Sequence, residues 1–94
     1  MIGINVTYTT KPGKGEEFLG DIAACGVAGV IREEDGCIQY DYFRSVHDPD
    51  KVLLVEKWTD REAQTVHLTQ PHMTQLKILK ERYVLGTIVD FYDL

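Results

Sequence analysis

The stretch VLLVEKWTDRE, residues 52–62, decides the fold. Its first seven residues have the β-branched and apolar character of a strand, and side chains of a strand point alternately to its two faces. Both faces are apolar here: one carries Val52, Leu54 and Trp58, and the other carries Leu53 and Val55. A strand of this kind is predicted to be covered on both sides.

The second half of the stretch predicts a helix. Thr59 and Glu62 have the spacing of a capping box, in which the threonine hydroxyl bonds the amide of Glu62 and the glutamate reaches back. We therefore expect a helix from Asp60 to about Leu68. Pro71 then suits the first turn of a further helix, because proline lacks the N–H that this position leaves unpaired.

The rest of the chain is read outward from this stretch. Residues 37–46 form a preceding strand, joined to residues 52–58 in a hairpin by the turn-forming residues 47–50. Near the start, residues 2–9 alternate with period two, and residues 16–34 carry apolar stripes with helical spacing. A last strand is expected at residues 87–92.

The order β-α-β-β-α(α)-β predicts an α+β class protein: a single domain, residues 1–94, with a ferredoxin-like fold and its helices on one face of an antiparallel sheet. The helices leave the second face of the sheet uncovered. Because the last two strands are apolar on both sides, we expect a second copy to cover that face and the protein to be a homodimer.

Charge and composition exclude several classes of partner. The net charge is −5 and the basic residues form no stripe, so neither nucleic acid nor an anionic membrane surface is expected to bind. No apolar run has the length of a membrane span, and the first residues carry no basic leader region. We expect a cytoplasmic protein in which Cys25 and Cys37 are buried thiols.

Four ordered segments resemble the antibiotic biosynthesis monooxygenase family: KPGKGEEF at 11–18, EDGCIQY at 34–40, LLVEKW at 53–58 and VHLTQPHM at 66–73. The resemblance covers nearly the whole chain. It implies a dimeric α+β barrel in which two sheets pack back to back, with a pocket between sheet and helices in each subunit. Members of this family include cofactor-free monooxygenases of phenols and quinols, haem-degrading oxygenases and an isomerase of a sugar phosphate.

The haem-degrading branch is not expected. Asn5 matches the asparagine that this branch carries on its first strand, but His67 stands where its tryptophan falls and Lys77 stands near its histidine. A metal site from His67 and His72 is weakly supported, because Pro71 interrupts the helix between them and no third ligand is apparent. No nucleotide-binding motif occurs, and we expect no cofactor.

Three residues are predicted to be catalytic. His67 is assigned as general base, because an imidazole titrates near physiological pH; the alternative is a solvated histidine at a helix end. Trp58 would stack on a planar substrate, or belong to the core. Asn5 would donate a hydrogen bond to a developing oxyanion, or lie on the polar surface of the sheet.

Four residues are predicted to bind substrate. Glu56 would orient His67 or a substrate hydroxyl, although a structural pairing with a lysine or arginine is favoured. Tyr40 and Tyr42 would form a pocket wall, or core, and His72 a pocket rim. Three functions remain open: a cofactor-independent monooxygenase acting on a small aromatic or quinol-like substrate with dioxygen, a proton-transfer isomerase, and a dimeric ligand-binding module without catalysis.

Overall fold

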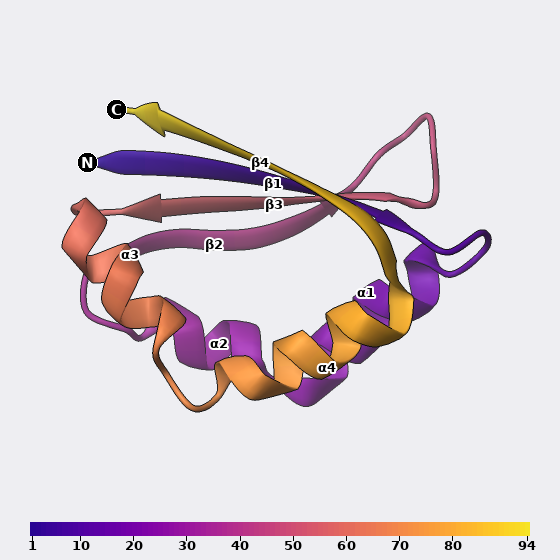
Figure 1. Ribbon diagram of the computed structural model, residues 1–94, viewed down its shortest axis with the longest axis horizontal. Helices are drawn as coiled ribbons and strands as arrows, with labels where there is room; N and C mark the ends of the chain where they lie inside the picture. The colour runs from indigo at the N-terminus through magenta and orange to yellow at the C-terminus, as the bar shows by residue number, and fades with distance from the viewer.

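The computed structural model describes residues 1–94 and contains four strands and four helices (Figure 1). In chain order they are β1 (Ile2–Thr10), α1 (Gly15–Cys25), α2 (Val27–Arg32), β2 (Cys37–Arg44), β3 (Lys51–Trp58), α3 (Arg61–Leu68), α4 (Met73–Tyr83) and β4 (Val84–Asp93). No helix is long and apolar enough to cross a membrane.

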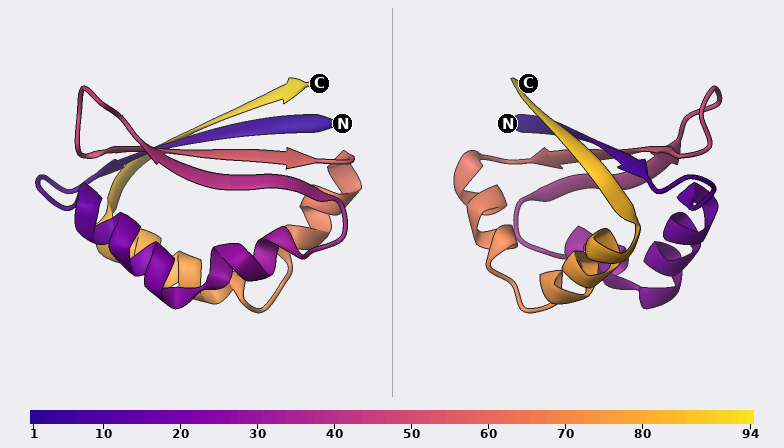
Figure 2. Two further views of the ribbon diagram at one scale, coloured as in Figure 1. Left: turned by 180° about the vertical axis from the view of Figure 1, so that it is seen from behind. Right: turned by 45° about the vertical axis from the view of Figure 1, so that its right-hand side comes forward.

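The strands form one antiparallel sheet in the order β2-β3-β1-β4. All four helices lie on one face of this sheet, and the other face is bare (Figures 1 and 2). The α+β ferredoxin-like fold predicted from the sequence is therefore confirmed, including the hairpin formed by β2 and β3.

The core lies between the sheet and the helices. The sheet contributes alternate residues, as its period of two requires, and α1, α2 and α4 contribute one apolar stripe each. Its largest fully buried side chains include Ile4, Leu54 and Trp58 from the sheet and Phe18, Ile31 and Leu76 from the helices. This layer fixes the distance between α3, α4 and the sheet.

The prediction of a single helix over residues 16–34 is wrong in one respect, because the structure has two helices there, divided at Gly26. This glycine has a φ of 72°, in the left-handed region that ends a helix and that side chains disfavour. The two helices therefore pack differently: α1 packs against α4, whereas α2 packs against β2.

The expected capping box is also corrected. Asp60, and not Thr59, is the N-cap of α3, and its Oδ1 accepts a hydrogen bond from the Ala63 N–H at 2.8 Å. Asp60 has extended backbone angles (φ −158°, ψ 175°), which direct its carboxylate to the amide three residues ahead. The helix therefore begins at Arg61, one residue later than expected.

Strand β2 ends at Arg44 and contains an irregularity of register between Cys37 and Gln39. A register shift of this kind disrupts the strict alternation of side chains. Ile38 is consequently 50% exposed, whereas Tyr40, two residues further along the strand, is buried.

Candidate functional site

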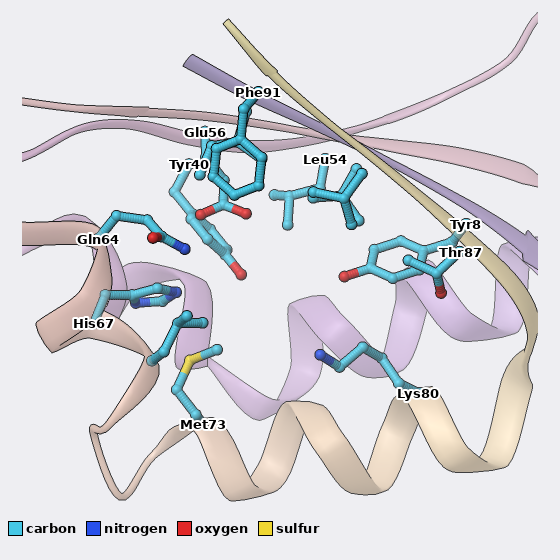
Figure 3. A pocket seen from close by; sticks show the side chains of 14 residues that line it. Tyr8, Tyr40, Leu54, Glu56, Gln64, His67, Met73, Lys80, Thr87 and Phe91 are labelled. Atoms are coloured by element: carbon cyan, nitrogen blue, oxygen red, sulfur yellow. The ribbon is translucent and has the colours of Figure 1, made fainter. Parts of the chain in front are cut away.

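A cavity of about 290 Å³ lies between the sheet and the pair α3 and α4 (Figure 3). Nine of its fourteen lining residues are hydrophobic, which suits an apolar organic ligand. The apolar walls include Ile4, Val6 and Leu54 from the sheet and Met73 from α4. The five polar lining residues are Glu56, Gln64, His67, Lys80 and Thr87, and two of the nine hydrophobic ones, Tyr8 and Tyr40, carry a hydroxyl.

The sheet register gives this cavity two ends. Glu56 and Phe91 flank Ile4, whereas Thr87 flanks Tyr8. Ile4 and Tyr8 are four residues apart on one strand, so the two ends are separated by about 13 Å.

His67, from the last turn of α3, is held by Glu34. Its side chain is 1% exposed, and its Nδ1 lies 3.1 Å from each carboxylate oxygen of Glu34. A carboxylate only accepts hydrogen bonds, so Nδ1 carries the proton and Nε2 keeps a free lone pair. Nε2 makes no hydrogen bond to the protein, and His67 lines the cavity (Figure 3). This arrangement leaves Nε2 available to accept a proton from a ligand.

The turn that follows α2 brings Glu34 to this position. Gly36 has a φ of 85°, and a Cβ there would lie 2.6 Å from the Ala63 Cβ of α3, so the turn packs directly against that helix. Its carbonyl accepts the Thr59 N–H at 2.8 Å. Sequence reasoning missed Glu34, because it is far from His67 in the chain and belongs to no motif that links the two.

Trp58 lies behind the cavity wall and does not line it. It is fully buried, and its ring packs on the imidazole of His67 with centroids 4.6 Å apart and a 35° angle between planes. Its Nε1–H donates to the Glu56 Oε1 at 3.1 Å. The expected stacking on a substrate is corrected: Trp58 packs against the two polar residues that face the cavity.

Glu56 is buried, and this burial raises the pKa of its carboxyl group above the ordinary value. The Trp58 N–H, His67 and Lys80 oppose the rise without cancelling it. No lysine or arginine forms an ion pair with Glu56, so the favoured structural pairing is wrong. The second carboxyl oxygen makes no hydrogen bond within the protein and belongs to the cavity wall.

The two predicted tyrosines lie in different places, and only Tyr40 contacts this cavity. Tyr40 lines the cavity, and burial raises the pKa of its hydroxyl and of the Tyr8 hydroxyl, so both remain hydrogen-bond donors. Tyr42 packs edge-to-face on Tyr40, with centroids 5.8 Å apart, and lines a different cavity beside Arg32. Burial raises the pKa of Tyr42 to about 12.

His72 and Asn5 lie outside the cavity. His72, just before α4, donates from Nε2 at 2.8 Å to the Glu34 Oε2, an oxygen that also lies 3.1 Å from the His67 Nδ1. Asn5 points to the bare face of the sheet, because its neighbours on β1 point to the helices, and its Oδ1 accepts from the Tyr92 hydroxyl at 3.2 Å. The expected hydrogen bond from Asn5 to a substrate oxyanion is thus corrected for this cavity, which Asn5 does not line.

Lys80 is a second residue that the sequence did not single out. It lines the cavity from α4, and Figure 3 shows its ammonium group directed inward. No carboxylate lies within ion-pairing distance of it. The spacing from Met73, seven residues earlier on the same helix face, would have indicated this orientation.

Comparisons with known proteins agree with this architecture. The chain is 35% identical over 90 residues to YcnE of Bacillus subtilis, named as a candidate monooxygenase, and the match covers 96% of this chain and 92% of that protein. Protein PA3566 of Pseudomonas aeruginosa superposes with a TM-score of 0.85 at 26% identity, covering 99% of this chain and 93% of that one.

A protein from Nitrosomonas europaea, described as a candidate antibiotic biosynthesis monooxygenase, shares the fold. Its TM-score is 0.88 at 20% identity, covering 100% of this chain and 98% of that one. The family model described as antibiotic biosynthesis monooxygenase matches residues 1–77. The chain therefore belongs to the antibiotic biosynthesis monooxygenase family.

Proposed function

We propose that this protein is a cofactor-independent monooxygenase that oxidises a small phenol or quinol with dioxygen. The observation that carries the proposal is the buried His67, whose Nδ1–H is held by Glu34 and whose Nε2 faces a mainly apolar cavity. An oriented base beside an apolar binding surface is what deprotonation of a phenolic hydroxyl needs. The name of the relative YcnE supports the reaction class.

The chemistry starts with proton transfer from the substrate hydroxyl to Nε2 of His67. The resulting anion is electron-rich and transfers one electron to dioxygen, which gives a substrate radical and superoxide. These two combine, so that a C–O bond forms at a ring carbon that bears hydrogen. Loss of that hydrogen as a proton, cleavage of the O–O bond and release of one water leave a quinone, and the four electrons taken from the phenol reduce the dioxygen.

The other residues of the site assist these reaction steps by holding His67 or by contacting the substrate. Glu34 is a positioning residue, because it fixes the tautomer of His67 and stabilises the imidazolium that forms. Tyr40 would donate a hydrogen bond to a substrate oxygen, and Glu56, whose pKa is raised by burial, would face the substrate beside it. Trp58 holds both His67 and Glu56 in place.

We also propose that the active form is a homodimer joined through the bare face of the sheet. Phe43 and Ile88 are 49% and 60% exposed, and both lie on this face by the sheet register. Apolar side chains gathered on one face indicate a contact surface. Native mass spectrometry should give a dimer, and Ile88→Asp should give a monomer; a monomeric wild-type protein would contradict the proposal.

Oxygen uptake tests the proposed reaction. Metal-free protein is mixed with a panel of simple phenols and quinols, and oxygen consumption and quinone formation are followed together. His67→Gln should lower the rate by about 100- to 10,000-fold, the usual contribution of a general base, and Glu34→Gln should lower it less. His47→Gln is the matched control, because His47 is an exposed histidine in the β2–β3 turn. Equal rates for wild type and His67→Gln would refute the role of His67.

One observation favours a second function, proton-transfer isomerisation. Glu56 and His67 line the same cavity, and they are an acid and a base whose surroundings differ. Such a pair can move a proton between two carbons of a carbonyl compound without oxygen. Deuterium incorporation from solvent into a carbonyl substrate under anaerobic conditions would support this function, and tight binding without any turnover would favour a binding module.

A further inference from the structure

We propose that the substrate carries a carboxylate, which Lys80 binds at the end of the cavity away from His67. This inference rests on the proposed function, because it takes the reacting hydroxyl to lie at His67. It narrows the substrate from any small phenol to a hydroxylated aromatic acid.

The first argument is that the charge of Lys80 has no counterpart. Its side chain is partly buried and lines the cavity, and no aspartate or glutamate lies within 4.0 Å of it. Glu56 carries a carboxyl group on which the charge of Lys80 acts, but burial disfavours the charged form of that group. A cation on the wall of a mainly apolar cavity attracts an anionic group of the ligand, because the bound ligand displaces water from both charges and their interaction then becomes stronger.

The second argument is the distribution of polar groups along the cavity. Tyr8 and Thr87 are register partners on β1 and β4, and both line the cavity. Figure 3 shows their hydroxyls at the same end as the Lys80 ammonium group, with Glu56, Gln64 and His67 at the other end. The end that contains Lys80 thus offers one positive charge and two hydroxyl donors, which suits the single charge and two oxygens of a carboxylate.

The third argument is size. The two ends lie about 13 Å apart along β1, and the Lys80 and Tyr8 side chains project into that length from their own ends (Figure 3). One aromatic ring with a hydroxyl and a carboxylate on opposite sides would present one polar group to each end. The volume of about 290 Å³ accommodates one such ring with its substituents.

Binding of a matched pair of probes tests the inference. 4-Hydroxybenzoate and its neutral isostere 4-hydroxybenzamide are titrated calorimetrically into wild type, Lys80→Met, Lys80→Arg and Lys77→Met. Wild type should prefer the acid by about tenfold or more, the size of a charge-assisted hydrogen bond. Lys80→Met should lose this preference and Lys80→Arg should keep most of it. Lys77→Met, on the exposed side of the same helix, should behave as wild type.

Each other result overturns the inference in a recognisable way. Equal affinity for acid and amide, a preference that survives in Lys80→Met, or no binding of either probe to wild type would refute it. Tighter binding of 4-hydroxyphenyl phosphate than of 4-hydroxybenzoate would replace carboxylate by phosphate. If the acid is preferred through Lys80 but no phenol is oxidised, the proposed function fails and the anion site stands. If neutral quinols are oxidised through His67 without any preference for acids, only the inference about Lys80 fails.

Discussion

The burial of Glu56 makes a quantitative prediction about stability and pH. In the folded protein its pKa lies above the reference value of 4.5, chiefly because burial disfavours the carboxylate. Below pH 4.5 the group is protonated in both folded and unfolded states and contributes no penalty. As the pH rises through the interval between the unfolded and folded pKa values, the unfolded chain ionises first, so unfolding becomes more favourable.

Glu56→Gln removes this titration but keeps the hydrogen bond, because the amide oxygen can accept the Trp58 N–H. We therefore expect the variant and wild type to differ least in acid. With increasing pH the variant should become the more stable of the two. The difference in the free energy of unfolding should grow by up to about 1.4 kcal/mol per pH unit inside the interval and then level off.

Urea denaturation from pH 4 to 8 at one protein concentration measures this difference. Trp58 is the only tryptophan and reports on its own neighbourhood, and circular dichroism reports on the whole fold. The groups whose charges act on Glu56 are His67, Lys80 and Glu34, and all three are retained in the variant. Exposed Gln75→Ala, which changes no titratable group, is the control and should give a difference that does not depend on pH. A flat difference for Glu56→Gln, or a wild type that gains on the variant as pH rises, would refute the reasoning.

Three further predictions concern local structure. Gly36→Ala should lower the free energy of unfolding by about 1–3 kcal/mol, because of its positive φ and its contact with α3, whereas exposed Gly20→Ala should raise it by about 0.5–1 kcal/mol; thermal melts of both variants check this pair. Asp60→Ala should lower the free energy of unfolding by about 1 kcal/mol, because the N-cap is lost, and Thr59→Ala should lower it clearly less. Urea denaturation measures both variants, and a larger loss for Thr59→Ala would show that Thr59 and Glu62 form the capping box after all. Nitrogen-15 spectra of neutral His67 should show the proton on Nδ1, and a proton on Nε2 would contradict its assignment as base.

Much of the fold could be predicted from the spacing of apolar residues and from the turn-forming residues in the sequence. The alternation in residues 2–9 and the two-faced apolar run at 52–58 predicted strands that the structure contains. The errors arose where a backbone angle or a single amide decides the outcome. Gly26 lies within the helical pattern of residues 16–34, and its left-handed angle depends on the packing of α1 against α4 and of α2 against β2, which periodicity does not contain.

The site was predictable to the extent that it lies on single elements. His67, Glu56 and Tyr40 were singled out and meet at one cavity. Asn5 was placed with them on the strength of family resemblance, although the alternation on β1 already put it on the polar face. Glu34 could not be found, because its contact with His67 depends on how a turn docks on a distant helix.

The position of β1 in the sheet has a consequence for the chain during synthesis. β1 lies between β3 and β4, so its first residue, Ile2, pairs with Trp58 on one side and Asp93 on the other. β1 leaves the ribosome before both of its neighbours, so it has no partner in this sheet until β3 follows, about 40 residues later. At about 5–20 residues per second this delay lasts roughly 2–8 s. Throughout this delay the row formed by Ile4, Val6 and Tyr8 is open to association with other chains. We therefore expect translation of one message by many ribosomes at once to be the step most sensitive to the supply of chaperones.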